Sequence, residues 1–379
     1  MKTGLRKILL GGCIVLISAM AAAEPGAGGA VLQPENPLVP PLTRSLLISG
    51  HSLTDLAYAG LLQKLGQTEG HAIDYEMQTA PGSTLHERFH GRSDRVHEPV
   101  AKADLPAPAL GYFLEKRGYD QMLVTEQHRL LDALLWDRTA RSLALMARAF
   151  HAHNPAAPIY FFIPWLSLSD RDNPSAWIRY ERRAHRMWLC LVHDVNRHLG
   201  TIGTRREIEP VPGALALVYL AEELSSSPML QGFEQLPVSD RMSLIFRDDV
   251  HLTELGTLYT AMVTSAWMVG QVPELDKAWG VSAQDGQAET LRNIAAAFVE
   301  NYRLEQSETQ PCGAIHRWAF ITHYVRYTAE VFDRDETGAA ARVWRQLARA
   351  ARFYWRFWNG LDADLPLTDK GGAGAGVLA

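Results

Sequence analysis

Two short stretches of this chain carry side chains that together could perform nucleophilic chemistry. Ser52 follows the apolar run "LLISG", which stops at Gly50, and "RDDVHLTELG" carries Asp248 and His251 three positions apart. A carboxylate that orients an imidazole lets the imidazole take the proton of a serine hydroxyl, which then attacks a carbonyl carbon. Asp249 competes with Asp248 for this role, although a residue only two positions before His251 reaches the ring less easily. Taken alone, a Gly-x-Ser triplet is more often a turn or a helix cap.

Other polar or flexible residues also come directly after apolar runs. Gly82 lies in "APGS", and Glu126, Gln127 and His128 follow "QMLVT". The backbone N–H of Gly82 and the side-chain amide of Gln127 could donate hydrogen bonds to a developing oxyanion. Trp165 follows "YFFIP" and could either stack on a sugar or close the hydrophobic core.

The segments between these residues alternate between two kinds of pattern. Short segments, most of them continuous apolar runs, predict strands at residues 45–50, 71–78, 121–126, 158–164 and 213–220. Amphipathic patterns predict helices at residues 56–66, 133–153, 177–200 and 253–269. Such an order is typical of a three-layer α/β/α sandwich with a central parallel five-stranded sheet. Ligands of these folds bind beyond the carboxyl ends of the strands, where Ser52 and Gln127 are expected.

Four of these stretches resemble the conserved blocks of the SGNH/GDSL hydrolase family. They are "GHSLTD", the stretch around Gly82, "VTEQ" and "DDVHLTELG", and they cover about residues 45–270. The resemblance implies a Ser52–His251–Asp248 triad, with Ser52 N–H, Gly82 N–H and the Gln127 side chain in the oxyanion hole. His51 stands where the family usually has aspartate. Thr125 to His128 stand where Gly-x-Asn-Asp is usual, so Glu126 could instead occupy the donor position.

A competing motif for metal chemistry follows Gly82. "HERFH", from His86 to His90, fits the H-E-x-x-H pattern of zinc metallopeptidases, with Glu87 as the base. His97 does not have the spacing that a third ligand requires in the metzincin pattern. The chain holds 14 histidines, so a chance match is credible. We therefore expect no metal and no cofactor.

The first residues have the three parts of a secretory signal peptide. "MKTGLRK" is basic, "ILLGGCIVLISAM" is apolar and "AAAEP" is a cleavage site, which predicts export to the periplasm or the medium. We expect a signal peptide at residues 1–23 and a Pro/Gly-rich linker at 24–44. After them come the hydrolase-like domain at 45–270, a helical extension at 271–370 and a flexible tail at 371–379. No membrane span is expected once the peptide has left.

The composition bears on two questions, whether the protein binds nucleic acid and whether its cysteines form a disulfide. The 379 residues carry a net charge of −5, which gives no reason to expect nucleic-acid binding. Two cysteines remain after the signal peptide, Cys190 and Cys312, and export permits a disulfide between them. Two separate buried thiols are an equally good interpretation.

The predicted helical extension carries an aromatic stripe that includes Trp344, Tyr354, Trp355 and Trp358. This stripe could cradle a sugar or touch a membrane surface, but packing onto the main domain is the interpretation that we prefer. The extension could also dock a protein partner.

These observations predict an exported serine esterase that removes acetyl or another small acyl group. The acyl group could be carried by a carbohydrate. An O-acyltransferase that uses the same serine is the nearest alternative. A binding or assembly protein on a degenerate scaffold comes from a different class. Histidine side chains ordinarily titrate at about 6.5, so we expect esterase activity to fall below neutral pH.

Overall fold

A parallel five-stranded sheet organises the part of the chain that the computed structural model describes. These residues are 43–68, 70–91, 108–204, 206–227, 229–275, 286–305, 314–333 and 338–360. They belong to one compact unit, Pro41–Ala379. The predicted signal peptide, the predicted tail and nearly all of the predicted linker lie outside the described residues, as does Cys312.

The strands run in the order β2-β1-β3-β4-β5, and each pairs in parallel with its neighbour. Their bounds are β1 Arg44–Gly50, β2 Ile73–Thr79, β3 Gln121–Thr125, β4 Ile159–Phe162 and β5 Ile208–Val211. Leu46, Leu47 and Ile48 of β1 are all fully buried, as expected for a strand covered on both faces. The prediction of a central parallel five-stranded sheet is therefore confirmed.

One predicted strand is wrong. Residues 213–220, "GALALVYL", belong to helix α7, Gly213–Ser226, and the fifth strand is the shorter segment "IEPV" just before it. A continuous apolar run fits a buried strand and a buried helix equally well. Most of α7 is buried, so its sequence lacks the polar face that would have marked it as a helix.

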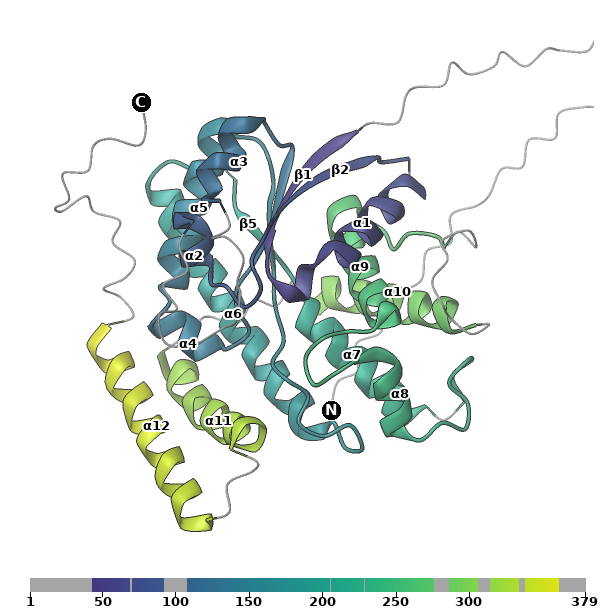
Figure 1. The fold of residues 1–379 in the computed structure, drawn as a ribbon, viewed down its shortest axis with the longest axis vertical. Helices are drawn as coiled ribbons and strands as arrows, with labels where there is room; N and C mark the ends of the chain where they lie inside the picture. The colour runs from purple at the N-terminus through teal and green to yellow at the C-terminus, as the bar shows by residue number, and fades with distance from the viewer. Residues whose placement is uncertain are drawn as a thin grey trace, which may run out of the picture. The chain divides into compact units, whose positions relative to one another are not determined.

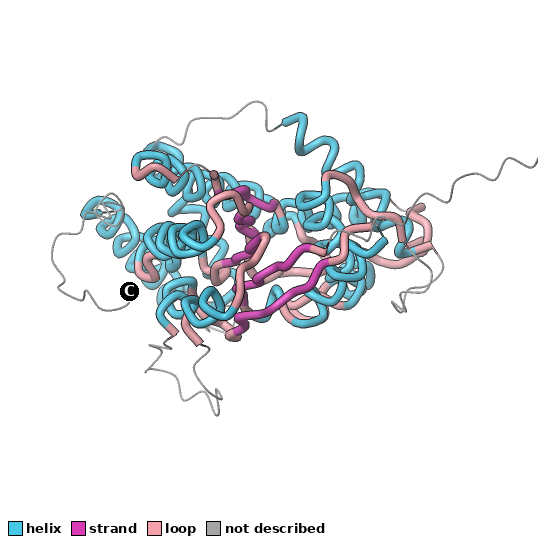
Figure 2. Tube along the Cα trace, turned by 90° about the horizontal axis from the view of Figure 1, so that it is seen from above, coloured by secondary structure: helices cyan, strands magenta, loops and turns pink. Residues whose placement is uncertain are grey.

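Helices flank the sheet, and Figure 1 and Figure 2 show them on either side of the strands. On one side α1 packs against α9, and α7 lies beside α9; on the other side α5 packs against α6. The bounds are α1 Leu56–Thr68, α5 Thr139–His153, α6 Ser175–Thr201 and α9 Glu254–Val269. The shorter segments are η1 Ser52–Thr54, α2 Leu85–His90, α3 Leu110–Lys116, α4 Leu130–Leu135 and α8 Val238–Ile245.

Beyond residue 270 the described elements are helices. They are α10 Gln287–Glu305, α11 Ala314–Phe332 and α12 Ala339–Gly360. Helix α10 packs on α9 and α7, α11 packs on α6, and α12 packs on α11 and α4. The domain boundary at residue 270 stays a prediction. Cys190, on α6, is disulfide-bonded. None of the described helices is long and apolar enough to cross a membrane.

The outer edge of β5 is occupied by a side chain. The Asn196 side-chain amide of α6 donates to Ile208 O at 2.9 Å, and its oxygen accepts from Ile208 N at 2.8 Å. Two residues further along the same strand stands Pro210, which has no N–H. Backbone groups two residues apart point to the same side of a strand, so Pro210 leaves this edge without a donor.

Candidate functional site

Ser52 and His251, 199 positions apart in sequence, meet at the carboxyl end of β1. Ser52 is the first residue of η1, and its Oγ lies 3.0 Å from His251 Nε2. His251 Nδ1 lies 2.8 Å from Asp248 Oδ2. A carboxylate can only accept, so Nδ1 carries the ring hydrogen and Nε2 is left to accept from the serine hydroxyl. Carboxylate, imidazole and hydroxyl thus form one hydrogen-bonded chain.

Gly50 makes the turn before Ser52 possible. A Cβ atom at this position would collide with the Oγ1 atom of Thr54, so only glycine lets η1 fold back over the end of β1. This agrees with the tight turn that the sequence predicts between the apolar run and Ser52.

The loop that carries Asp248 and His251 is closed at both ends. Phe246 and Leu252 form an antiparallel bridge across its base, and Arg247 N donates to His251 O at 2.8 Å. Thr253 then caps α9 by accepting from Gly256 N at 3.3 Å. The loop therefore presents the imidazole on a short, internally bonded segment rather than on a long flexible one.

Asp248, and not Asp249, is the carboxylate that orients the ring. Partial burial raises the pKa of Asp248, but hydrogen bonds from His251 N and Val250 N and from the His251 ring lower it to about 2. The two backbone bonds measure 2.7 and 2.9 Å. Asp248 is therefore ionised throughout the neutral range, as an orienting carboxylate must be.

The loop between β4 and α6 holds the loop that carries Asp248 and His251 through two hydrogen bonds. Trp165 Nε1 donates to Val250 O at 2.8 Å, and Leu168 N donates to Asp249 O at 2.6 Å. Trp165 is fully buried, so its ring is closed to a substrate. The predicted role of Trp165 in stacking on a sugar is therefore wrong, and the alternative, closing the core, is what the residue does.

Two residues that the sequence did not single out hold the β4–α6 loop in turn. Glu181 of α6 accepts from Leu166 N at 2.6 Å, and burial raises the pKa of Glu181 well above its usual value. Tyr327 of α11 donates to Ser167 O at 2.6 Å and accepts from Ser169 N at 3.2 Å. Both lie inside long amphipathic segments, where no local pattern separates them from ordinary core residues.

His51, in the position before Ser52, is a buried and neutral link. Its Nε2 lies 2.8 Å from Glu126 O, and its Nδ1 accepts from Leu53 N at 3.4 Å. Burial, with Arg88 nearby, lowers the pKa of His51 to about 3. The ring therefore carries its hydrogen on Nε2, and it ties the turn after β1 to the end of β3.

Glu126 is fully buried, and its carboxyl group bonds to neighbouring backbone and hydroxyl groups rather than to a substrate position. Its Oε1 accepts from Leu85 N at 3.0 Å and from Gln127 N at 2.7 Å, and its Oε2 accepts from Thr139 Oγ1 at 2.7 Å. Burial raises the pKa of Glu126 to about 7, with Arg88 opposing the shift. Glu126 therefore links the start of α2, the end of β3 and the start of α5.

Arg88 fixes the turn that contains Gly82. Its Nη1 donates to Ser83 O and Ser83 Oγ, both at 2.8 Å, and its Nη2 donates to Thr125 O. Burial lowers the pKa of Arg88 to about 10, so it remains charged at neutral pH. Gly82 has a φ of 66°, a conformation that favours glycine. Ala80 N donates to Gly50 O at 3.1 Å, which joins this turn to the end of β1.

The side chain of Gln127 does not face the serine in the way that the resemblance implies. Its Nε2 donates to Arg129 O and to Asp137 Oδ2, both at 3.1 Å, and its Oε1 accepts from Arg129 N at 2.9 Å. Both ends of the amide are therefore engaged within its own loop. The prediction that Gln127 completes an oxyanion hole is wrong in this conformation.

The "HERFH" motif forms α2, where its glutamate caps the helix. Glu87 Oε2 accepts from Thr84 N at 2.7 Å while Thr84 Oγ1 accepts from Glu87 N at 3.2 Å, which is a capping box. The rings of His86 and His90 lie 4.6 Å apart between centroids. In the described part of the chain, no group of three or more His, Cys, Asp or Glu side chains could hold a metal ion.

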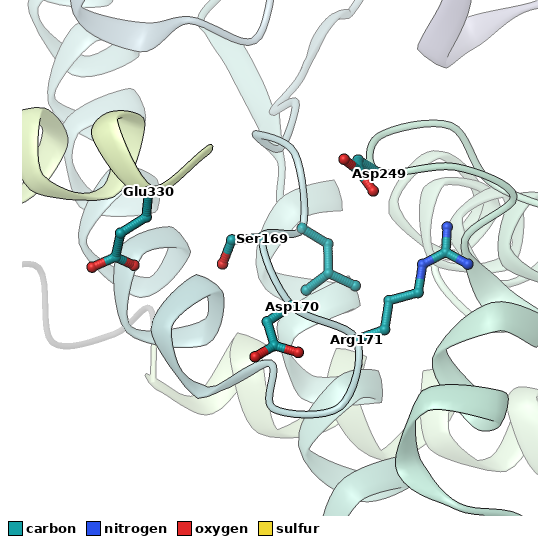
Figure 3. A pocket seen from close by; sticks show the side chains of 6 residues that line it. Ser169, Asp170, Arg171, Asp249 and Glu330 are labelled. Atoms are coloured by element: carbon teal, nitrogen blue, oxygen red, sulfur yellow. The ribbon is translucent and has the colours of Figure 1, made fainter. Parts of the chain in front are cut away.

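A cavity of about 510 Å³ opens beside the loop that holds Asp248 (Figure 3). The figure shows Glu330 reaching it from α11, Ser169 and Asp170 from the β4–α6 loop, and Asp249 from the loop before α9. Its lining residues are Leu168, Ser169, Asp170, Arg171, Asp249 and Glu330. Neither Ser52 nor His251 is among them, so the cavity adjoins the site without containing it.

Comparison with known proteins finds two weak structural likenesses. No family model and no curated protein matches the chain. A DUF4886 family protein from Bacteroides uniformis has 14% identity and a TM-score of 0.46, covering 71% of this chain and 98% of its own. A Clostridium thermocellum family 3 carbohydrate esterase has 14% identity and a TM-score of 0.35, covering 59% of this chain and 93% of its own. At these values the two likenesses support no conclusion about what this chain does.

Proposed function

We propose that this chain is an exported serine esterase of the SGNH type, in which Ser52 is the nucleophile. The observation that carries the proposal is the hydrogen-bonded chain from Asp248 through His251 to Ser52, with its 3.0 Å contact between Oγ and Nε2. Ser52 and the loop that carries Asp248 and His251 are distant in sequence, and the three side chains meet in the order that acyl transfer requires. Export rests on the signal-peptide pattern at residues 1–23.

In the proposed reaction, Ser52 Oγ forms a bond to the acyl carbon while its proton passes to His251 Nε2. Asp248 stabilises the imidazolium that results. Ser52 N–H and Gly82 N–H are the proposed donors to the oxyanion. His251 then gives the proton to the ester oxygen as the C–O bond breaks. Water then attacks the acyl carbon while His251 Nε2 takes its proton. His251 returns the proton to Ser52 Oγ as the acyl–serine bond breaks, which releases the acid and the free serine.

The burial of Trp165 removes the aromatic rim that favoured a carbohydrate. The proposal is therefore a carboxylic ester with a small acyl group, and it leaves the alcohol part unassigned. An acyltransferase would use the same acyl-serine with an alcohol in place of water. Product analysis in the presence of added sugar alcohols separates the two, because only the transferase forms a new ester.

The decisive test is the reaction of Ser52 with an ester and with a fluorophosphonate, which labels activated serines whatever acyl group the enzyme prefers. We expect Ser52→Ala to lose labelling and to lower kcat for p-nitrophenyl acetate by ~10⁴-fold or more. Ser226→Ala is the matched control, because Ser226 is exposed at the end of α7 and its hydroxyl donates to Glu222 O of the same helix. Unchanged labelling of Ser52→Ala, or the absence of labelling in the wild-type protein, would refute the proposal.

A further inference from the structure

Helix α12 presents large apolar side chains to solvent along one side. Trp344 is 72% exposed and Trp355 is 66% exposed, and Leu347 and Ala351 between them are exposed as well. We call these four residues the α12 stripe. Their spacing of three, four and four positions places them on one side of the helix. The sequence-based preference for packing this aromatic segment onto the main domain is therefore wrong for Trp344 and Trp355.

The side of α12 that packs on the rest of the molecule lies roughly opposite the stripe. Phe353 is buried against the rings of Trp136 and Tyr324, at centroid distances of 5.1 and 5.4 Å. Arg349 pairs with Asp333 at 3.3 Å, on the same side of the helix as Phe353. At 100° per residue, Phe353 is turned by about 160° from the middle of the stripe. The stripe therefore faces outward from α12, which Figure 1 shows at the edge of the fold.

Helix α12 is also strongly basic. It contains five arginines and no acidic residue, in a chain whose net charge is −5. Arg342, Arg345 and Arg352 are exposed, although the Arg352 guanidinium lies over the Trp136 ring that also contacts Phe353, 4.5 Å from its centroid. Two such helices brought together stripe to stripe would set like charges against each other, which disfavours a second copy as the partner.

An outward apolar stripe flanked by arginine is the arrangement of helices that lie in the plane of a membrane surface. Trp side chains favour the interface between lipid tails and headgroups, and arginine binds lipid phosphates. From these features we infer that α12 docks the protein on anionic phospholipid bilayers, with the stripe inserted and Arg345 on the headgroups. This surface is separate from Ser52 and does not depend on the proposed esterase activity.

The test is flotation of the full chain with phosphatidylcholine vesicles that contain or lack phosphatidylglycerol. We expect binding to the anionic vesicles only, weakening as salt is added. The double substitution Trp344→Ser with Trp355→Ser should weaken binding by about 30-fold or more, because two large apolar side chains are removed. Arg345→Gln should weaken it by about 5-fold.

The matched control is Tyr112→Ser, which removes an exposed aromatic side chain from α3. It should bind as the wild type does, and so should Ser52→Ala. The substituted Trp residues are exposed, so circular dichroism should show an intact fold. Equal binding by the double variant and the wild type would overturn the inference. So would sedimentation showing a wild-type dimer that the double variant loses, because the stripe would then cover a second copy.

Discussion

Glu126 is a buried acid whose ionisation opposes folding. Its pKa rises from the usual 4.5 to about 7 on burial. Well below pH 4.5 the carboxyl is protonated in both the folded and the unfolded chain, so its ionisation costs the folded state nothing there. As the pH rises towards 7, the unfolded chain releases the proton while the folded chain retains it, and stability is lost.

Replacing Glu126 with glutamine removes this titration and keeps an acceptor for Leu85 N and Gln127 N. Relative to Glu126→Gln, we expect the wild-type protein to lose on the order of 3 kcal/mol of unfolding free energy between about pH 4.5 and pH 7. Urea denaturation of both proteins at several pH values measures the difference. A difference that stays constant with pH would show that Glu126 does not titrate in this way.

At the scale of residues, the sequence was most informative where chemistry requires a short spacing. Asp248 and His251 could be paired because three positions let a single turn of chain join them, and Gly50 marked the tight turn before Ser52. The directions of Gln127 and Trp165 could not be predicted. Each depends on partners from other segments, Asp137 for the amide and Val250 for the indole.

At the scale of elements, the β4–α6 loop connects α11 to the loop that carries Asp248. Tyr327 holds Ser167 O and Ser169 N, while Leu168 N between them holds Asp249 O. A helix far along the chain therefore helps to set the position of the imidazole and its carboxylate.

Removing the Tyr327 hydroxyl tests this connection. We expect Tyr327→Phe to lower kcat for p-nitrophenyl acetate by about 10-fold, because small displacements of reacting groups are costly, with KM nearly unchanged. Tyr324→Phe is the control on the same helix, because it loses a bond to Asp132 rather than to the loop. Each variant should lose about 1 kcal/mol of unfolding free energy. Similar kcat values for the two variants would argue against a positioning role.

Strands β1, β3 and β4 could be predicted because each is a short apolar run with a turn at its end, and β2, "IDYEMQT", alternates between apolar and polar residues. The fifth could not, since "IEPV" is only four residues long and half polar, while the apolar run after it is a helix. Short helices such as α2 escaped prediction for a related reason: six residues hold too few turns to show a helical period.

At the scale of the whole molecule, α12 buries few of the side chains that the structure describes in it. Among the α12 side chains that the structure describes, Phe353 is the buried one. Elements with few buried contacts open separately from the core. This bears on the predicted helical extension, because α12 could open while the sheet remains folded.

Phe353→Ala should increase amide hydrogen exchange throughout α12 while β1 and β3 keep their protection. The lost contacts with Trp136 and Tyr324 are worth about 3 kcal/mol or more at a buried phenylalanine. Hydrogen-exchange mass spectrometry resolves the two regions. Equal loss of protection in the sheet would show instead that α12 and the strands unfold as one cooperative unit.

The side-chain amide of Asn196 takes the place that a sixth strand would have beside β5. Both main-chain groups of Ile208 are already hydrogen-bonded, so they cannot pair with an added strand. Pro210, two residues later, has no N–H to donate to one. Growth of the sheet by added strands is blocked along this border. Assembly at this edge would have to be built from side-chain contacts, so the edge resists aggregation by strand addition.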